Sequence, residues 1–325
     1  MRVHILDDWF DTLRGLPSFG RLAGHDVTVW NDHVEEADIL ASRLAEAETL
    51  VLFRERTPVT GALLDRLPTL KLISQRSVYP HVDVSGCTRN KVLLCSNMHG
   101  DTPSIAAAEL TFALILAAAR QLPQQMASMQ AGRWQMGVGQ TLRGRRLGLY
   151  GYGRIAKVVA GYGRAFGMEV VWWGSDDGRA RARADGEKVA ESRDSFFADA
   201  DVVSLHVRLK PETKGMITEV DLAAMKPSAS FVNTSRAGLI APGALKAALA
   251  AGRPGRLALD VFDTEPLTDP DDPIANHPNV IGTPHIGYVT EDELDLQFAD
   301  IYDQINAYAE GAPIHMINPE VWPNR

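Results

Sequence analysis

Short apolar runs recur along nearly the whole chain, separated by segments whose apolar residues follow helical spacing. In the first hundred residues these runs are Val3–Leu6, Val27–Trp30, Leu50–Phe53, Leu70–Ser74 and Val92–Cys95. Later in the chain they are Leu147–Tyr150, Glu169–Trp173, Val202–His206, Phe231–Thr234, Leu257–Val261 and Val280–Gly282. Strands that alternate with helical stretches of about 10–15 residues are typical of βαβ units. The pattern predicts an α/β protein with two parallel sheets.

A continuous apolar segment, Ile105–Ala119, divides the two series of runs. Pro103 and Glu109 lie near its start, as is typical of helix N-termini. The segment is apolar on nearly every face, so we expect a helix that is buried on all sides. It is too short, and with Glu109 too polar, to span a bilayer. At about 150 residues per domain, 325 residues correspond to two domains.

Two later helices carry clear end signals. The helix Pro242–Ala251 has proline near its start, and Gly252 follows its end. The final helix begins at Thr290, and Glu293 three residues later predicts a capping box. Apolar residues at spacings of three and four then form one stripe, which predicts packing along one face: Leu294, Phe298, Ile301, Ile305 and Tyr308.

Charge and cysteine content exclude several classes of protein. The chain has 41 acidic and 33 basic residues, a net charge of −8, so we expect neither a nucleic-acid nor a membrane partner. Cys87 and Cys95 cannot form a disulfide framework, and their spacing matches no metal site. The N-terminus carries acids where a signal peptide has an apolar core. These features predict a cytoplasmic protein without a metal.

The sharpest local signal is a glycine turn directly after the run Leu147–Tyr150. Gly151 and Gly153 are followed by Ala156 and by a helical apolar face. In a dinucleotide fingerprint the first glycine makes the tight turn, the second admits a pyrophosphate, and the third small residue allows helix–strand packing. The pyrophosphate then binds at the helix N-terminus. The strand before and the helix after the turn predict a dinucleotide-binding domain.

The position that selects between NAD and NADP holds no acid. A carboxylate for the ribose 2′-hydroxyl is expected at the end of Glu169–Trp173, where this chain has Gly174. Its absence removes repulsion against a 2′-phosphate, which Ser175, Arg179 or Arg181 can contact; alternatively these arginines form a solvated helix face. We favour NAD, and NADP stays open.

Three further strand ends carry polar residues suited to carbonyl chemistry: Arg236, Glu265 and His285. Ligands of open parallel sheets bind at the carboxyl ends of strands, so we expect these side chains to meet beside the cofactor. A histidine exchanges a proton with an alcohol or ketone, a glutamate on its second nitrogen fixes the tautomer, and an arginine pairs with a substrate carboxylate. The set predicts hydride transfer to or from a carbonyl.

Several segments together resemble the D-isomer-specific 2-hydroxyacid dehydrogenases, in particular their phosphoglycerate-dehydrogenase-like branch. The resemblance rests on residues 144–156, 233–238, 259–267 and 283–287, with further similarity at 107–111, 119–123 and 132–134. It covers nearly the whole chain in order. It implies a Rossmann-type doubly wound cofactor domain, residues 99–287, inserted into a smaller flavodoxin-like substrate domain, residues 1–98 and 288–325.

The resemblance also implies roles for individual residues. Arg236, Glu265 and His285 form the catalytic set, and a small D-2-hydroxy acid or 2-keto acid is the substrate. Implied cofactor contacts are Gly151, Gly153, Arg154, Ile155, Ser175, His206, Thr213, Thr234, Ser235 and Asp260. Family members are typically homodimers that pair through their cofactor domains.

The chain departs from the family pattern at the expected substrate loop. Members usually have a glycine-rich turn there, whereas residues 75–83 contain no glycine. We expect the amides near Ser77 and Val78, together with Arg236, to bind the substrate in a pocket of different shape. Arg54 either adds a second cation to this pocket or lies on the surface. Arg208 also stands where members usually have proline.

Two other functions remain open at this level. A dinucleotide-sensing binding protein, like the corepressors of this fold, would keep the glycine turn. Formate oxidation needs no base, and that branch pairs its histidine with a neutral amide, so Glu265 disfavours it.

Overall fold

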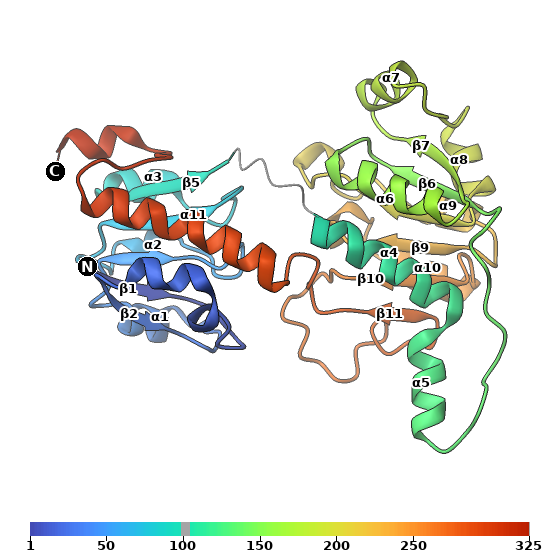
Figure 1. Cartoon of the computed structure of the whole chain (residues 1–325), viewed down its shortest axis with the longest axis horizontal. Helices are drawn as coiled ribbons and strands as arrows, with labels where there is room; N and C mark the ends of the chain where they lie inside the picture. The colour runs from blue at the N-terminus through green and yellow to red at the C-terminus, as the bar shows by residue number, and fades with distance from the viewer. Residues whose placement is uncertain (99–104, 325) are drawn as a thin grey trace. The chain divides into compact units, whose positions relative to one another are not determined.

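The computed structural model describes residues 1–98 and 105–324 and divides into two compact units, Met1–Thr102 with Thr290–Arg325, and Pro103–Val289. Each unit contains one wholly parallel sheet flanked by helices (Figure 1). The α/β fold class is therefore confirmed. The domain limits expected at 98/99 and 287/288 stay a prediction, and Pro103, expected in the first turn of a helix, lies outside the described residues.

The sheet of the first unit has five strands in the order β2-β1-β3-β4-β5, which is the flavodoxin order. The strands are β1 Arg2–Ile5, β2 Asp26–Val29, β3 Thr49–Val51, β4 Leu72–Arg76 and β5 Leu93–Asn97. The helices are α1 Ala37–Arg43, α2 Gly61–Leu64, α3 Val84–Arg89 and α11 Glu291–Ala309, with 3₁₀ turns at Leu13–Gly15, Pro17–Leu22 and Pro319–Asn324. The final helix, α11, packs against β4 and β5, as its apolar stripe predicts.

The sheet of the second unit has six strands in the order β11-β10-β9-β8-β6-β7. They are β6 Arg146–Tyr150, β7 Glu169–Trp173, β8 Val202–Leu205, β9 Ser230–Asn233, β10 Arg256–Leu259 and β11 Val280–Gly282. Val189 forms an isolated parallel bridge with Trp172 of β7. A doubly wound Rossmann sheet has a further strand at this edge, beside β7. The order reverses at β6, so the glycine turn lies at the topological switch point.

The helices of the second unit cover both faces of this sheet (Figure 1). They are α4 Ile105–Arg120, α5 Leu122–Gln130, α6 Arg154–Ala165, α7 Asp176–Ala184, α8 Arg193–Asp199, α9 Glu219–Ala224 and α10 Ala244–Ala251, with 3₁₀ turns at Pro211–Thr213 and Ala237–Leu239. Within the described ranges no single helix is long and apolar enough to cross a membrane. Helices α4 and α5 reach that length and apolarity only when taken together, and the pair is bent by 61°.

The expectation that the apolar helix is buried on all sides is wrong. One side of α4 packs against α6 and the sheet, where Phe112, Leu114 and Ile115 are buried. The opposite side is partly exposed, with Leu110 and Leu116 half-buried and Ala113 exposed. Of the two buried clusters of this unit, α4 packs against only one, so the side of the helix that faces away from that cluster stays partly exposed.

Element ends differ from the predicted ones by a residue or two. Leu6, Phe53 and Val261 are buried although the strands end before them, and the Leu6 N–H still donates to the Val51 carbonyl over 3.2 Å. The predicted capping box of α11 is half formed: Thr290 accepts the Glu293 N–H, but the Glu293 carboxylate binds the Gln297 amide. Gly252 ends α10 with φ +62°, as predicted.

Candidate active site

The glycine turn after β6 is shaped by the loop beside it. Gly151 has φ +109°, and a Cβ atom there would lie 2.3 Å from the carbonyl oxygen of His206. Glycine alone lets the two segments approach so closely. Gly153 is the N-cap of α6, and no side chain of the described residues caps this helix. The first turn of α6 holds an exposed Arg154 and a half-buried Ile155.

The position after β7 is adjacent to the same turn. Gly174 has φ +154°, and a Cβ atom there would lie 3.4 Å from the Gly151 nitrogen. Ser175 caps α7, because its Oγ accepts the Gly178 N–H over 3.2 Å. Arg179 pairs with Asp176 and stacks over Trp173, 4.2 Å from the ring centroid. Both side chains thus stabilise the start of α7, and their contact with a cofactor stays a prediction.

The loop after β8 brings two predicted contacts to this edge. The Nε2 atom of His206 lies 3.0 Å from the Ser204 Oγ, and burial lowers the pKa of His206 to about 4. The ring is therefore neutral at pH 7 and adds no charge beside the glycine turn. Thr213 Oγ1 donates to the Arg208 carbonyl over 2.8 Å and accepts the Lys210 N–H over 2.8 Å, which closes the loop.

The segment after β9 positions Arg236. The fully buried Asn233 accepts the Ser235 N–H over 3.0 Å and donates to the Arg236 carbonyl over 3.0 Å. Ser235 Oγ donates to the Leu205 carbonyl over 2.7 Å, and the Thr234 hydroxyl lies 2.7 Å from that of Thr111. These bonds hold the backbone of the turn, while the half-buried Arg236 side chain donates to the Ser235 carbonyl over 2.7 Å.

The structure brings two predicted catalytic residues into direct contact. His285 Nδ1 and Glu265 Oε2 are 2.6 Å apart, and the two side chains are 29% and 34% exposed. The second oxygen of Glu265 accepts the Phe262 N–H over 2.9 Å. The Tyr288 ring meets the imidazole edge-on, with 5.8 Å between centroids. Since Nδ1 is occupied by the carboxylate, Nε2 is the nitrogen of His285 that can exchange a proton with a ligand.

Asp260 holds the loop that carries His285. Its carboxylate, 1% exposed, accepts bonds from the Thr283 hydroxyl over 2.6 Å and from the Ile286 and Gly287 N–H groups over 2.9 Å each. His285 itself has φ +54°, a left-handed conformation that residues other than glycine adopt at a cost of about 1–3 kcal/mol. The three bonds flank His285 on both sides and maintain this conformation.

Charge at the site favours an ionised Glu265. Burial by itself would raise the pKa of Glu265, but the hydrogen bond and charge of His285, the Phe262 N–H and the charge of Arg236 together hold it below its usual range. The effect of Arg236 places its guanidinium within electrostatic range of Glu265. Burial raises the pKa of Asp260 despite its three donors. The charge of Arg236 therefore acts on the carboxylate that binds His285.

The predicted substrate residues of the first unit lie after its own strands. Ser77 has φ +76°, and Gln75 Nε2 donates to the carbonyls of Ser77 and Val78 over 3.0 and 3.3 Å. Serine thus adopts the backbone conformation that glycine usually supplies. Arg54 also has a positive φ, +62°, and its Nη1 lies 3.4 Å from Gln297 Oε1. Their role in substrate binding stays a prediction.

Comparison with known proteins agrees with this geometry. Residues 112–287 match the family model described as D-isomer specific 2-hydroxyacid dehydrogenase, NAD binding domain. This span contains the glycine turn and all three predicted catalytic residues. The chain belongs to the D-isomer-specific 2-hydroxyacid dehydrogenase family. It is thus an oxidoreductase of this family with an NAD(P)-binding domain.

Individual relatives of this dehydrogenase cover most of its length. A glyoxylate reductase from Aeropyrum pernix is 34% identical, with 91% of each chain covered. A D-3-phosphoglycerate dehydrogenase from Methanocaldococcus jannaschii is 35% identical over 84% of this chain, which spans only about half, 52%, of that relative. Among solved structures, a phosphoglycerate oxidoreductase from Vibrio cholerae is 43% identical with TM-score 0.91, covering 96% of this chain and 100% of that one.

The residues of this dehydrogenase fit a dinucleotide. A Cβ at Gly153 would meet no heavy atom of the described residues within 4 Å, so the start of α6 faces open space. A helix N-terminus without a side-chain cap attracts a pyrophosphate through its N–H groups and dipole. The neutral His206 neither attracts nor repels an anion, and Gly174 adds no side chain beside the turn.

Sequence reasoning missed how the chain positions its predicted catalytic residues. It gave Asn233 no role, although an asparagine directly after a strand is a recognisable turn signal. It also predicted only a cofactor contact for Asp260, whereas the Asp260 carboxylate accepts hydrogen bonds from Thr283, Ile286 and Gly287. Tyr288, against the His285 ring, carried no sequence signal.

Proposed function

We propose that the chain interconverts a small 2-keto acid and the corresponding D-2-hydroxy acid, with His285 as the acid/base. The hydrogen bond between His285 Nδ1 and Glu265 Oε2 carries this proposal. In the direction of reduction, Nε2 of the protonated ring donates to the carbonyl oxygen; in oxidation the neutral ring accepts the hydroxyl proton. Glu265 stabilises the imidazolium and fixes the tautomer.

Arg236 is proposed to bind the substrate. Its guanidinium pairs with a carboxylate through two parallel bonds and polarises an adjacent carbonyl. The Asn233 bonds to the turn support this role, since they limit where the arginine can reach. We also assign substrate binding to Arg54 and to the amides near Ser77 and Val78. The positive φ values of Arg54 and Ser77 support turns shaped for a ligand.

NAD(P) is proposed to bind along the carboxyl edge of the six-stranded sheet. Gly151, Gly153, Arg154 and Ile155 would hold its pyrophosphate, and Asp260 its nicotinamide amide, with further contacts from Ser175, His206, Thr213, Thr234 and Ser235. When bound, the nicotinamide supplies or accepts the hydride. Either NAD or NADP can bind, because Gly174 carries no carboxylate that would repel a 2′-phosphate.

The substrate class is proposed from the relatives. Two relatives that the chain covers over nine-tenths of their length are glyoxylate reductases, 34% and 31% identical. Glyoxylate and hydroxypyruvate are therefore the first substrates to test, with pyruvate, phosphohydroxypyruvate and bulkier 2-keto acids beside them.

The test assays this panel with NADH and NADPH, using wild type and His285→Asn. We expect turnover of at least one small 2-keto acid by wild type. His285→Asn should abolish turnover but leave the dinucleotide Kd within a few-fold, measured by fluorescence titration. A wild-type protein that binds dinucleotide and reduces no keto acid would favour the sensing protein. Unchanged turnover by the variant would remove His285 from the mechanism.

We further propose a homodimer that forms through the second unit. Helix α5 and the segment after it extend away from the sheet of that unit (Figure 1). They expose large apolar side chains: Met126, Met129, Trp134, Met136 and Val138. With the uncovered side of α4 they form an apolar surface of a kind that monomers rarely expose.

A cytoplasmic location is proposed on the state of the cysteines. Cys87 and Cys95 are free and buried, and burial raises the pKa of each thiol to about 12. Protonated, buried thiols of this kind persist in a reducing compartment.

A further inference from the structure

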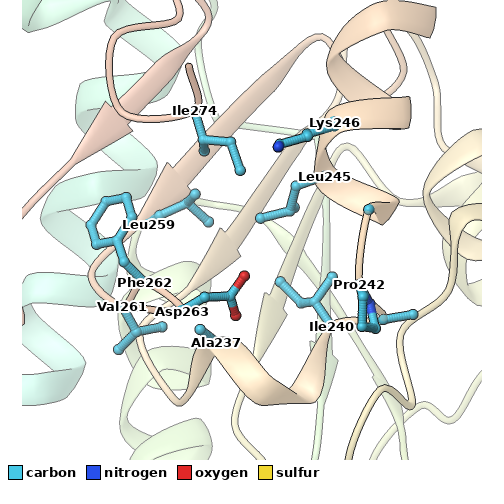
Figure 2. Close-up of a pocket in the computed structure, with 12 residues that line it drawn as sticks. Ala237, Ile240, Pro242, Leu245, Lys246, Leu259, Val261, Phe262, Asp263 and Ile274 are labelled. Atoms are coloured by element: carbon cyan, nitrogen blue, oxygen red, sulfur yellow. The ribbon is translucent and has the colours of Figure 1, made fainter. Parts of the chain in front are cut away.

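The second unit contains a cavity of about 190 Å³ that the proposed reaction does not use. It is bounded by the 3₁₀ turn after Arg236, the start of α10 and the loop after β10. Its walls are mainly aliphatic, from Ile240, Leu245, Leu259 and Ile274, with Phe262 on one side (Figure 2). This volume is below that of most sites for drug-sized ligands, about 300–1,000 Å³. The cavity therefore suits a small metabolite.

Two opposite charges border these aliphatic walls. In Figure 2 the carboxylate of Asp263 points into the space between Phe262 and Ile240, and the ammonium group of Lys246 lies on the side of Ile274. Both residues are exposed. Within residues 1–98 and 105–324, neither side chain has a hydrogen bond or an ion pair. The cavity thus combines an apolar wall with one available anion and one available cation.

We propose that this cavity binds a small aliphatic α-amino acid and that its occupancy regulates the Glu265–His285 pair. The α-ammonium group pairs with Asp263, the α-carboxylate with Lys246, and a branched aliphatic side chain contacts Ile240, Leu245 and Leu259. A dinucleotide or a peptide is too large for this volume. A purely apolar ligand would leave both charges without a counter-ion.

Phe262 connects the cavity to the catalytic pair. Its side chain lines the cavity, while its N–H donates to Glu265 Oε1 over 2.9 Å. Its ring also packs on β11: a Cβ atom at Gly282 would lie 3.1 Å from the Phe262 Cζ. A ligand that moves Phe262 changes the hydrogen bonding of Glu265, whose other oxygen binds His285. The regulatory part of the proposal rests on the proposed function, whereas the binding part does not.

Calorimetric titration of the dinucleotide-free protein with L-leucine tests binding. We expect saturable binding that Asp263→Asn and Lys246→Met each weaken about tenfold, the loss of one charged contact. Asp271→Asn and Lys214→Met, exposed charges outside the cavity, should leave the affinity unchanged. Leu245→Trp, which fills the cavity, should abolish binding, with its melting temperature as the check on folding.

Analogues of L-leucine that lack one charged group test whether Asp263 and Lys246 both contact the ligand. 3-Methylbutylamine lacks the carboxylate and 4-methylpentanoate lacks the amine, so each should bind at least tenfold more weakly than L-leucine. Equal affinity of either analogue would overturn the amino-acid assignment. No binding of L-leucine to wild type, or wild-type affinity in both charge variants, would overturn the site itself.

The pH profile of turnover tests the coupling. At a concentration near its wild-type Kd, L-leucine should shift the acidic limb of the kcat profile in wild type and much less in Asp263→Asn, which binds it about tenfold more weakly. An unchanged profile despite binding would overturn the regulatory part. If no keto acid is reduced, the proposed function fails while the calorimetric result stands. Coupling is then measured as the change in L-leucine affinity caused by bound NADH, and no change would overturn the regulatory part.

Discussion

Gly287 donates its N–H to Asp260 Oδ2 over 2.9 Å, and a Cβ atom at position 287 would lie 3.1 Å from that same oxygen. The absence of a side chain thus allows the loop after β11 to lie on the buried carboxylate. Together with the Ile286 N–H and the Thr283 hydroxyl, this contact sets the backbone on both sides of His285. Asp260 is therefore a positioning residue for the histidine, besides its proposed cofactor contact.

Asp260→Asn should lower turnover by about a hundredfold, because a small displacement of His285 disrupts proton transfer. The amide keeps one acceptor oxygen, so its NH2 group would face either the Gly287 N–H or the Ile286 N–H, and the lost bond costs about 1–3 kcal/mol of unfolding free energy. Steady-state kinetics and urea denaturation measure the two effects. Thr283→Val removes one bond only and should cost less in both. Turnover within twofold of wild type for Asp260→Asn would refute the positioning role.

The depressed pKa of Glu265 predicts a specific pH dependence of stability. A carboxyl whose pKa is lower in the folded than in the unfolded state stabilises the fold above the unfolded value and loses this effect as pH falls through the folded value. Wild type should therefore exceed Glu265→Gln in stability at pH 6–7, and the difference should shrink below the ordinary value of 4.5. Thermal unfolding from pH 7 to pH 3 measures it. A difference independent of pH would contradict the ionised pair.

Gly151→Ala and Gly153→Ala form a matched pair. A Cβ at 151 meets the His206 carbonyl, and φ is +109° there, so this variant should lose about 1–3 kcal/mol of unfolding free energy and its dinucleotide binding. A Cβ at 153 meets no described atom within 4 Å, so that variant should keep its melting temperature and bind dinucleotide more weakly. Equal melting temperatures for the two variants would contradict the close approach.

Ser175→Asp tests the cofactor preference without disturbing α7. Aspartate also caps helix N-termini, so the melting temperature should not change. The added charge beside Gly174 should weaken NADPH binding relative to NADH by about tenfold, since it repels a 2′-phosphate. Fluorescence titration with both nucleotides gives the ratio. Ser175→Ala removes the cap and the hydroxyl without adding charge, so the difference between the two variants isolates the effect of the carboxylate on the ratio.

The dimer proposal predicts a change in mass when the exposed apolar side chains become polar. Wild type should sediment at twice its 35.5 kDa, and Met129→Glu combined with Trp134→Ser should sediment as a monomer. Both residues are exposed in the isolated chain, so the substitutions should not unfold it. A wild type that remains monomeric at micromolar concentration would refute the dimer.

The strands of both sheets and the glycine turn could be read from the sequence, because local patterns decide them. Alternation of apolar runs with helical spacing specifies βαβ units, and two glycines between a strand and a helix specify the turn. The family resemblance was also local, since each motif is a short stretch at one strand end. In each case neighbouring residues carry the whole signal.

Contacts between distant segments were decided by the tertiary structure alone. The strand ends predicted that His285 and Glu265 meet, but packing sets their 2.6 Å contact. The bonds from Asp260 to residues 283–287 join segments that no local pattern relates. The exposed side of α4 likewise depends on what packs against it: the residues are apolar all round, but a single core covers only one face. Ser77 adopts a glycine-like φ because Gln75 binds the carbonyls of its turn, a side-chain contact that residue type does not specify. Local spacing determines which elements form, and only packing decides which side chains they bring together.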